Sequence, residues 1–262
     1  MSPLLGELRA AHHANQFLNR ASLAALAHTR RHRALVTEAQ SAISEMLIIA
    51  RQPYLALSGG KDSALCLALA APVARSLGVP LIASWSDDEL EHDSQHPYMT
   101  ALCAQFGVPL MVVSARDTHA GWFRTWAQEP FWHERYPGTI DVATMDAVPA
   151  MRAFGYDGVI LGLRAEESSY RRINAAMRGR VYQRATGEWT AQPLARWRVE
   201  DVWAALLDRG VPWNPVYDRL TEIGVPLERQ RVGPLPLEDA RTLQVGWPVL
   251  WHRLVERHGD RW

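Results

Sequence analysis

The chain has 262 residues, of which 48% are hydrophobic and 21% are charged, and its formal net charge is zero. These values suit one α/β domain, or one domain with a small appendage, and give no argument for a nucleic-acid or membrane partner. No apolar run approaches the ~20 residues of a membrane-spanning helix. Residues 1–7 lack the charged and apolar regions of a secretory signal, so we expect a cytoplasmic protein.

The N-terminal part is rich in alanine and leucine, and residues 3–50 predict helix. His28 and His32 have the i, i+4 spacing of a metal-binding pair. No glutamate accompanies them as in H-E-x-x-H, and three arginines lie beside them. A solvated helix face is the favoured interpretation, and we assign no metal site.

A short apolar run from Tyr54 to Leu57 predicts a strand, and the apolar pattern from Ala64 to Leu77 predicts a helix. The sequence between them, Ser58 to Ser63, is S-G-G-K-D-S. Its two glycines, Gly59 and Gly60, allow a tight turn that gathers backbone N–H groups into a nest for an anion. The N-terminus of the helix adds partial positive charge. Strand, loop and helix together predict a phosphate-binding loop.

Lys61 is the single lysine of the chain, against twenty-seven arginines. A compact ammonium suits a phosphate as a point charge, and the hydroxyls of Ser58 and Ser63 add two donors. The loop differs from the commoner G-x-x-x-x-G-K-[ST] pattern, which would need glycine at Leu55 and serine or threonine at Asp62. The alternative interpretation is a chance Gly-Gly turn before a core helix.

Acidic residues follow the second predicted strand, Val79 to Trp85. In open α/β sheets, ligands bind beyond the carboxyl ends of the strands, so polar residues there face the expected site. Asp87 and Asp88 either contact the ribose or hold Mg²⁺ on the phosphates. Equally, Asp93 or a neighbour caps the next helix, which ends at Phe106.

The middle of the chain predicts two more strands, Val108 to Ser114 and Tyr156 to Leu161, with a helix over Met145 to Phe154. Residues 122–136 are rich in tryptophan and other aromatic residues. This segment is either a lid that stacks on a flat substrate or a cover packed on the sheet edge. Packing is the favoured interpretation.

An arginine-rich element follows the fourth strand, with the sequence Gly162-Leu-Arg164-Ala-Glu-Glu-Ser168-Ser-Tyr-Arg171. Arginine binds phosphate and sulfate oxygens through paired donors. A cluster at a strand end, across the sheet from a phosphate loop, therefore fits an anionic ligand. Four more arginines follow at positions 172, 178, 180 and 184. A solvated basic loop is the alternative for 178–184 and is weaker for Arg164 and Arg171.

The C-terminal part begins with the stretch Pro193–Trp203, which leads into a helix ending at Arg209. The stretch Val211–Tyr217 predicts a rigid turn with two prolines. Both stretches are interpreted as architectural. The predicted organisation is an N-terminal helical segment packed on the core, a nucleotide-binding α/β domain and a small C-terminal helical tail, over residues 1–50, 51–213 and 214–262.

Four segments, spanning about two-thirds of the chain, resemble the phosphoadenosine phosphosulfate (PAPS) reductase family of the PP-loop ATP pyrophosphatase superfamily. The matching patterns are the loop S-G-G-K-D-S, then G-L-R-x-E-x-S-x-x-R, then P-L-x-x-W-x-x-x-D-V-W, and an N-P-L-Y segment, at Ser58–Ser63, Gly162–Arg171, Pro193–Trp203 and Pro212–Tyr217. The resemblance implies an adenine nucleotide α-hydrolase-like fold, with a parallel sheet of about five strands flanked by helices. It further implies that Ser58 to Ser63 bind phosphates. Arg164 and Arg171 would grip the distal phosphate or sulfate, with Gly162 and Ser168 in the same binding element.

The chain departs from this family in its cysteines. Reductases of the family attack sulfur with a thiolate in a C-terminal E-C-G-L-H segment, and some members add cysteine pairs that bind an iron–sulfur cluster. Here Cys103 is the last cysteine, and Val225 and Glu228 stand where a family cysteine pair could follow Ile223-Gly224. Cys66 and Cys103 fall in predicted helices, where buried cysteines are usually inert. We expect neither cysteine-dependent PAPS reduction nor an iron–sulfur cluster.

The leading hypothesis is an enzyme that binds ATP with Mg²⁺, adenylylates an unidentified acceptor and releases pyrophosphate, with Lys61 and Asp62 as catalytic residues. A carboxylate, sulfate or a base under modification is the candidate acceptor, so nucleic acid would enter only as a modification substrate. The alternatives are a non-catalytic subunit that binds an adenine nucleotide or PAPS, and a reductase-like protein that uses a partner's thiol. The sequence leaves the oligomeric state open.

Overall fold

The computed structural model describes residues 20–87, 92, 94–114, 140–141, 147–226, 230–232 and 240–258. The described strands form one sheet of seven in the order β4-β3-β2-β1-β5-β7-β6. Neighbouring strands are parallel except for the antiparallel pair β6 and β7. The strands are β1 (Pro53–Ala56), β2 (Ile82–Asp87), β3 (Leu110–Ser114), β4 (Ile140–Asp141), β5 (Gly158–Ile160), β6 (Val181–Gln183) and β7 (Trp189–Ala191).

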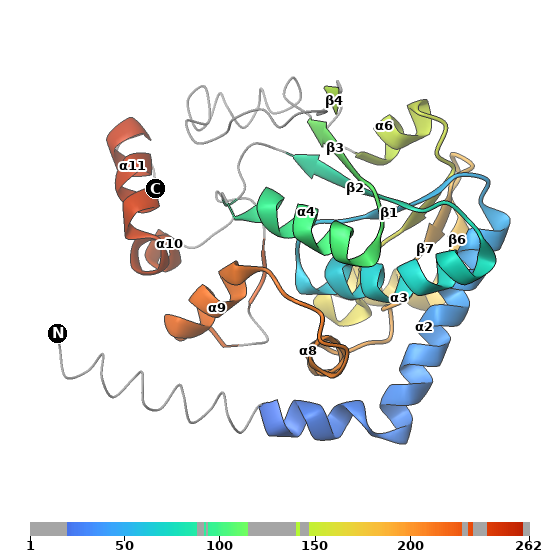
Figure 1. Cartoon of the computed structure of the whole chain (residues 1–262), viewed down its shortest axis with the longest axis horizontal. Helices are drawn as coiled ribbons and strands as arrows, with labels where there is room; N and C mark the ends of the chain where they lie inside the picture. Colours follow the sequence, from blue (N-terminus) through green and yellow to red (C-terminus); the bar gives the residue numbers. More distant parts are fainter. Residues whose placement is uncertain are drawn as a thin grey trace.

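Helices cover both faces of this sheet (Figure 1). Successive side chains of a strand point to opposite faces, so Leu55 joins a large core with α2, α3 and α8, whereas Tyr54 joins a smaller core with α6. The expected α/β class is confirmed. None of the described helices is long and apolar enough to cross a membrane. The helices are α2 (Arg30–Ile49), α3 (Lys61–Leu77), α4 (Gln95–Phe106), α6 (Ala147–Ala153), the 3₁₀ helix η2 (Ala165–Glu167), α7 (Ser169–Arg178), α8 (Val199–Asp208), α9 (Pro215–Glu222), α10 (Ala240–Gly246) and α11 (Pro248–His258).

The central strand β1 positions the candidate site. From β1 the chain proceeds outward through β2 and β3 to β4, and it then returns to the other side of β1 as β5. The connections that follow β1 and β5 therefore leave in opposite directions and open a crevice at the carboxyl ends of these two strands. This switch in strand order is where open α/β sheets bind ligands.

Within the described residues the sheet is wider than expected, with seven strands rather than about five. Strands β6 and β7, each three residues long, form an antiparallel pair next to β5, and the two-residue β4 extends the opposite edge. Strands of two or three residues have too few alternating apolar and polar positions to be recognised in the sequence. The additional strands leave β1 in the interior of the sheet.

Two predictions need correction, one of a helix and one of a turn. The helix expected over residues 3–50 is interrupted after residues 20–27, and α2 begins at Arg30 because the Thr29 hydroxyl accepts a hydrogen bond from the His32 backbone N–H. The rigid turn expected over Val211–Tyr217 is also shorter. It ends at Asn214, which caps α9, and a proline occupies the first turn of that helix.

Asp201 joins the N-terminal helices to α8. Its carboxylate accepts two hydrogen bonds from Arg31, at 2.7 and 2.9 Å, and one from the Arg198 backbone N–H. His32 is buried, with Nδ1 3.8 Å from Asp201 and its ring edge-on to Trp197. The solvated face expected for both histidines therefore holds for His28 alone and is wrong for His32. Its contacts with Asp201 and Trp197 account for its burial.

The pKa of Asp201 lies below its usual value. Burial alone would raise it, but the side chains of His32 and Arg31 and the Arg198 N–H lower it further than burial raises it. A depressed folded-state pKa contributes stability above the unfolded pKa of about 3.9, and this contribution is lost as pH falls through the folded value. The Asp201 contacts should therefore stabilise the fold fully at neutral pH and less in acid.

Asp201→Asn should lower the free energy of unfolding by about 1–3 kcal/mol at pH 7, because a buried charge-assisted pair is lost. The difference from wild type should shrink as pH falls below about 4. Urea unfolding at pH 7 and pH 3 measures both. Asp208→Asn is the matched control, since Asp208 is half-exposed on the same helix and 4.0 Å from His28, and it should change little. An Asp201 effect that persists unchanged in acid would contradict this account.

Candidate nucleotide-binding site

The predicted phosphate loop joins β1 to α3, and α3 begins at Lys61 rather than at Ala64. Gly59 has a φ of 71°, in the left-handed region, and a Cβ there would overlap the Gln95 side chain. Both the backbone and the packing therefore require glycine. At the other end of the loop, the Ser63 hydroxyl donates to the Gly60 carbonyl over 3.0 Å and fixes the start of the helix.

Four backbone N–H groups of the loop donate no hydrogen bond within the described part of the chain: those of Gly59, Gly60, Asp62 and Ser63. The first N–H groups of a helix have no intrahelical acceptor, so water or a ligand must accept from them. The N–H of Lys61, by contrast, donates to the Tyr217 hydroxyl over 2.9 Å. The free N–H groups and the dipole of α3 make this end of the helix an anion-binding position.

Gln95 of α4 and Asn214 at the start of α9 hold the loop from the protein side. Both side chains are fully buried. Gln95 Nε2 donates to the Ser58 carbonyl over 2.5 Å, and Gln95 Oε1 accepts from Asn214 Nδ2 over 2.6 Å. Asn214 Nδ2 also lies 3.5 Å from the Gly59 carbonyl. Because the protein engages the carbonyls of the loop, its N–H groups are left for a ligand.

Gly162 lets the chain beyond β5 lie directly against the start of α3. A Cβ at this position would lie 2.8 Å from both the Asp62 carbonyl carbon and the Ser63 nitrogen. These are backbone atoms that cannot move aside as a flexible side chain could. A glycine is required here for close approach, and it brings the arginine-rich element beside the phosphate loop.

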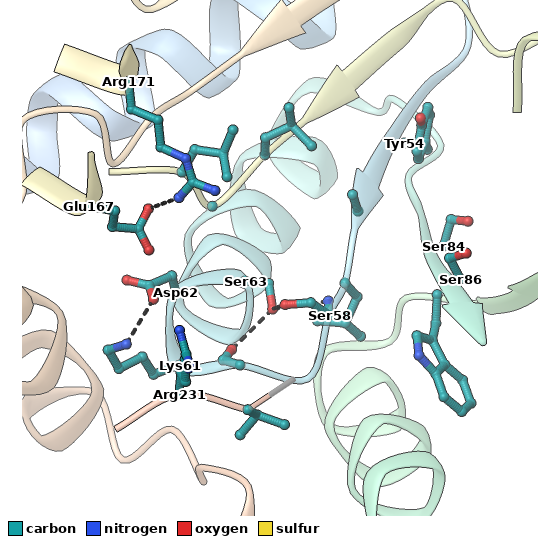
Figure 2. Close-up of a pocket in the computed structure, with 18 of the residues that line it drawn as sticks. Tyr54, Ser58, Lys61, Asp62, Ser63, Ser84, Ser86, Glu167, Arg171 and Arg231 are labelled. Atoms are coloured by element: carbon teal, nitrogen blue, oxygen red, sulfur yellow. Dashed lines mark hydrogen bonds and ion pairs between the residues drawn. The ribbon is translucent and has the colours of Figure 1, made fainter. Parts of the chain in front are cut away.

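A cavity of about 410 Å³ opens in front of the loop, within the usual size of a small-molecule site. It extends from the loop and the β5 end to β2, where Ser84 and Ser86 contribute hydroxyls (Figure 2). Its wall thus combines apolar strand residues with hydroxyls and charges. The lining residues are Tyr54, Ala56, Leu57, Ser58, Gly60, Lys61, Asp62, Ser63, Ser84, Trp85, Ser86, Leu161, Gly162, Leu163, Glu167, Arg171, Tyr217, Arg231 and Val232.

Asp62 bridges two cations. Its Oδ2 lies 3.1 Å from Lys61 Nζ, and its Oδ1 lies 2.6 Å from Arg164 Nε. Arg164 is buried and also pairs with Glu166. Burial alone would lower the pKa of Arg164, but Asp62 and Glu166 raise it above its usual value, so the guanidinium stays charged. In this arrangement Arg164 fixes Asp62, and Asp62 fixes the ammonium of Lys61.

Arg171 and Glu167 form a second ion pair on the cavity wall (Figure 2). The side chain of Arg171 is 40% exposed, and the one of Glu167 is 29% exposed. Ser168 caps α7 by accepting a hydrogen bond from the Arg171 backbone N–H over 3.1 Å. This cap sets the direction of the helix that carries Arg171, and the guanidinium therefore reaches the cavity.

The structure separates the predicted site residues into those on the cavity wall and those behind it. Gly59 shapes the turn, Arg164 holds Asp62, and Ser168 caps α7. Asp87 is buried at the end of β2 and is not among the lining residues. The wall residues among those predicted are Ser58, Gly60, Lys61, Asp62, Ser63, Gly162 and Arg171.

Other predictions lie outside the described residues: Asp88 as a ribose or Mg²⁺ contact, Asp93 as a helix cap, and the aromatic segment 122–136 as lid or cover. The structure in turn adds lining residues that the motifs did not indicate. Ser84 is one residue of β2, and alternation along that strand would have indicated it once the site was located. Arg231 comes from the C-terminal part of the chain, where no motif indicated it.

Both cysteines are buried, as their positions in predicted helices indicated. Burial raises the pKa of Cys66 far above its usual value, and it raises the pKa of Cys103 to about 12. Because the thiolate is the nucleophilic form, thiols with such pKa values are unreactive at neutral pH. Neither cysteine is set up for attack on a sulfur atom.

The strand, loop and helix at a switch in strand order define an α/β protein with a PP-loop type of phosphate-binding loop. A family model described as the phosphoadenosine phosphosulfate reductase domain matches residues 52–227. The chain therefore belongs to this family. Its sequence is also 22% identical over 250 residues to the uncharacterized protein YbdN of Escherichia coli strain K12, covering 78% of this chain. The chain spans about 60% of the length of that relative.

Solved structures share the fold. A PAPS reductase from Candida auris, in a phosphate complex, matches with a TM-score of 0.52 and 15% identity, covering 77% of this chain and 90% of that one. An FMN adenylyltransferase from Candida glabrata, in complex with FAD and inorganic pyrophosphate, matches with a TM-score of 0.51 and 12% identity, covering 81% of this chain and 71% of that one. At these identities the likeness establishes the fold alone.

Proposed function

We propose that the protein binds ATP at the Ser58–Ser63 loop and transfers its adenylyl group to an acceptor, releasing pyrophosphate. The observation that carries this proposal is the set of four backbone N–H groups at the start of α3 that have no acceptor within the described residues. Three of them belong to residues that line the cavity together with Lys61, namely Gly60, Asp62 and Ser63. A row of donors beside one compact cation suits the closely spaced oxygens of a polyphosphate.

The same groups would lower the barrier to cleavage between the α and β phosphates. As that bond breaks, negative charge gathers on the departing pyrophosphate, and fixed donors stabilise this charge without reorganising. Lys61 would supply the charge, and Asp62 would position it through its contact at 3.1 Å. ATP would arrive as its magnesium complex, with the ion held mainly by phosphate oxygens and water, because the wall carboxylates Asp62 and Glu167 already pair with cations.

The similarity of the chain to nucleotide-binding proteins supports a nucleotide ligand, and the reaction itself is a matter for experiment. The matched family is that of PAPS reductases, yet both cysteines of this chain are buried, so a transfer reaction that needs no thiol is favoured. A protein of the same fold holds FAD and inorganic pyrophosphate. The likeness in fold between that adenylyltransferase and this chain supports adenylyl transfer as the chemistry to test.

Product analysis with radiolabelled ATP tests the proposal. Purified protein should release pyrophosphate and transfer labelled AMP to the acceptor when the correct one is present among sulfate, amino acids, nucleosides and DNA, and free AMP forms only where the adenylylated acceptor is then cleaved. Lys61→Met protein, purified in the same way, controls for contaminating ATPases. Formation of ADP and phosphate would show cleavage of the wrong bond. Tight ATP binding with neither pyrophosphate release nor a labelled adenylylated product under every condition would instead assign the site to a non-catalytic nucleotide-binding subunit.

A further inference from the structure

The hydroxyl of Tyr217 has a donor that the described part of the protein does not use. Its oxygen accepts a hydrogen bond from the Lys61 backbone N–H over 2.9 Å. A phenol hydroxyl is a donor as well as an acceptor, with one proton to give. Within the described residues nothing accepts that proton. Because Tyr217 is only 2% exposed and a buried donor without an acceptor is costly, this proton is available to a ligand.

Tyr217 lines the cavity beside Gly60. A Cβ at Gly60 would lie 3.4 Å from Ser58 Oγ and 3.5 Å from the Tyr217 hydroxyl oxygen. The backbone of Gly60 is extended, with a φ of −79°, so the turn itself does not require glycine at this position. The absence of a side chain there leaves a notch between two hydroxyls, next to the free N–H of Gly60.

The surroundings of Tyr217 fix this hydroxyl in place. Tyr217 lies in the first turn of α9, directly after the cap Asn214, and its ring packs edge-on against Trp203 with 5.1 Å between the ring centroids. Lys61 Nζ lies 5.9 Å from the centroid of the same ring. Burial raises the pKa of Tyr217 above its usual value, further than the hydrogen bond from Lys61 lowers it. The group is therefore a protonated, fixed donor at neutral pH.

We propose that the Tyr217 hydroxyl donates to an oxygen of the β- or γ-phosphate of ATP, at the notch beside Gly60. The inference rests on the proposed function and deepens it, since it gives α9 a direct contact with the pair of phosphates that leaves as pyrophosphate. A hydrogen bond to an ionised oxygen is about twice as strong as one between neutral groups. One helical turn would then serve both sides of the loop, with Asn214 on a carbonyl and Tyr217 on the ligand.

Calorimetric titration of Tyr217→Phe with ATP and with pyrophosphate tests this inference. Losing one charge-assisted hydrogen bond should weaken the binding of both ligands by about tenfold or more. Tyr98→Phe is the matched control. Tyr98 is also a buried tyrosine, but its hydroxyl donates to the Pro212 carbonyl over 3.0 Å and it is not among the lining residues. Tyr98→Phe should bind both ligands like wild type.

A second variant separates donation to the ligand from bracing of the loop, because Tyr217→Phe also removes the acceptor of the Lys61 N–H. Replacing Tyr217 by 3-fluorotyrosine makes the hydroxyl a stronger donor and a weaker acceptor, since fluorine withdraws electrons from the phenol. Donation to a phosphate predicts tighter binding of pyrophosphate than in wild type. A residue that only braces the loop predicts weaker binding.

Gly60→Ala tests the position of the contact. A methyl group would fill the notch at ordinary contact distances and on an extended backbone, so thermal unfolding should show no loss of stability. The affinity for ATP and pyrophosphate should nevertheless fall by about tenfold or more, because the methyl group takes the place of a phosphate oxygen. An unchanged affinity would overturn the assigned position.

The possible failures are distinct. Equal affinities in wild type and Tyr217→Phe, or weaker pyrophosphate binding with 3-fluorotyrosine, would overturn this inference and leave the proposed function standing. Weaker ATP binding with unchanged pyrophosphate binding would assign the hydroxyl to another part of the nucleotide and also overturn it. A wild-type protein that binds neither ligand would overturn the proposed function and the inference together. If Tyr217→Phe does not fold, the sign of the 3-fluorotyrosine effect decides.

Discussion

Lys61→Met should reduce the rate of adenylyl transfer and pyrophosphate release by about 10²–10³-fold, the usual effect of removing one fixed donor to a developing negative charge. Lys61 is only 5% exposed, and its ammonium is held by Asp62 at 3.1 Å and the Gln230 carbonyl at 3.4 Å. It therefore needs little reorganisation when charge gathers on the leaving group. Initial rates of pyrophosphate release, with the acceptor found by product analysis, measure the effect.

The fold should tolerate this substitution. Methionine replaces most of the volume of the lysine side chain, and Asp62 keeps its contact with Arg164 at 2.6 Å. Lys61→Arg is the matched variant, because it retains the positive charge. Its larger planar guanidinium cannot take the exact position of the ammonium in a nearly closed site. It should therefore restore ATP affinity more than it restores the rate. Turnover by Lys61→Met at the wild-type rate would remove Lys61 from the mechanism.

The phosphate loop could be predicted from the sequence because its determinants are local. Glycines, lysine and hydroxyls lie within Ser58–Ser63, and the flanking strand and helix follow from short-range apolar patterns. The residues that hold the loop are remote. Gln95 lies 37 residues from Ser58 and Asn214 lies 155 residues from Gly59. No periodic pattern relates such positions, so the sequence indicated a turn at Asn214 without indicating what the turn supports.

The same distinction separates Arg171 from Arg231. Arg171 belongs to a motif that directly follows β5, so its approach to the site follows from strand order. Gln230, next to Arg231, reaches Lys61 across 169 residues through contacts at the end of α9. Arg164 shows the converse, since it shares the motif of Arg171 but is buried and paired with Asp62. A motif locates a residue near a site, and only packing decides whether it faces the ligand.

Asn214→Ala should lower the free energy of unfolding by about 2–4 kcal/mol, because it removes the cap of α9 and leaves the buried Gln95 Oε1 without its donor. The consequence should reach the ligand as well. Gln95 and Asn214 hold the Ser58 and Gly59 carbonyls, so a freed loop no longer presents its N–H groups in one fixed array. ATP affinity should therefore fall although neither side chain lines the cavity.

A double-mutant cycle of Asn214→Ala and Gln95→Ala, measured by urea unfolding, isolates the contact between the two amides. We expect a coupling energy of about 0.5–3 kcal/mol, since the second substitution removes an acceptor that the first has already left unpaired. Asn214→Ser separates the two roles of Asn214: a serine hydroxyl still caps α9, but it does not reach Gln95 in place of the amide. This variant should recover the part of the stability that the cap supplies, keep the loss that comes from the unpaired Gln95 Oε1, and lose ATP affinity. Additive effects in the cycle, or full ATP affinity in Asn214→Ser, would show that the amide pair does not hold the loop.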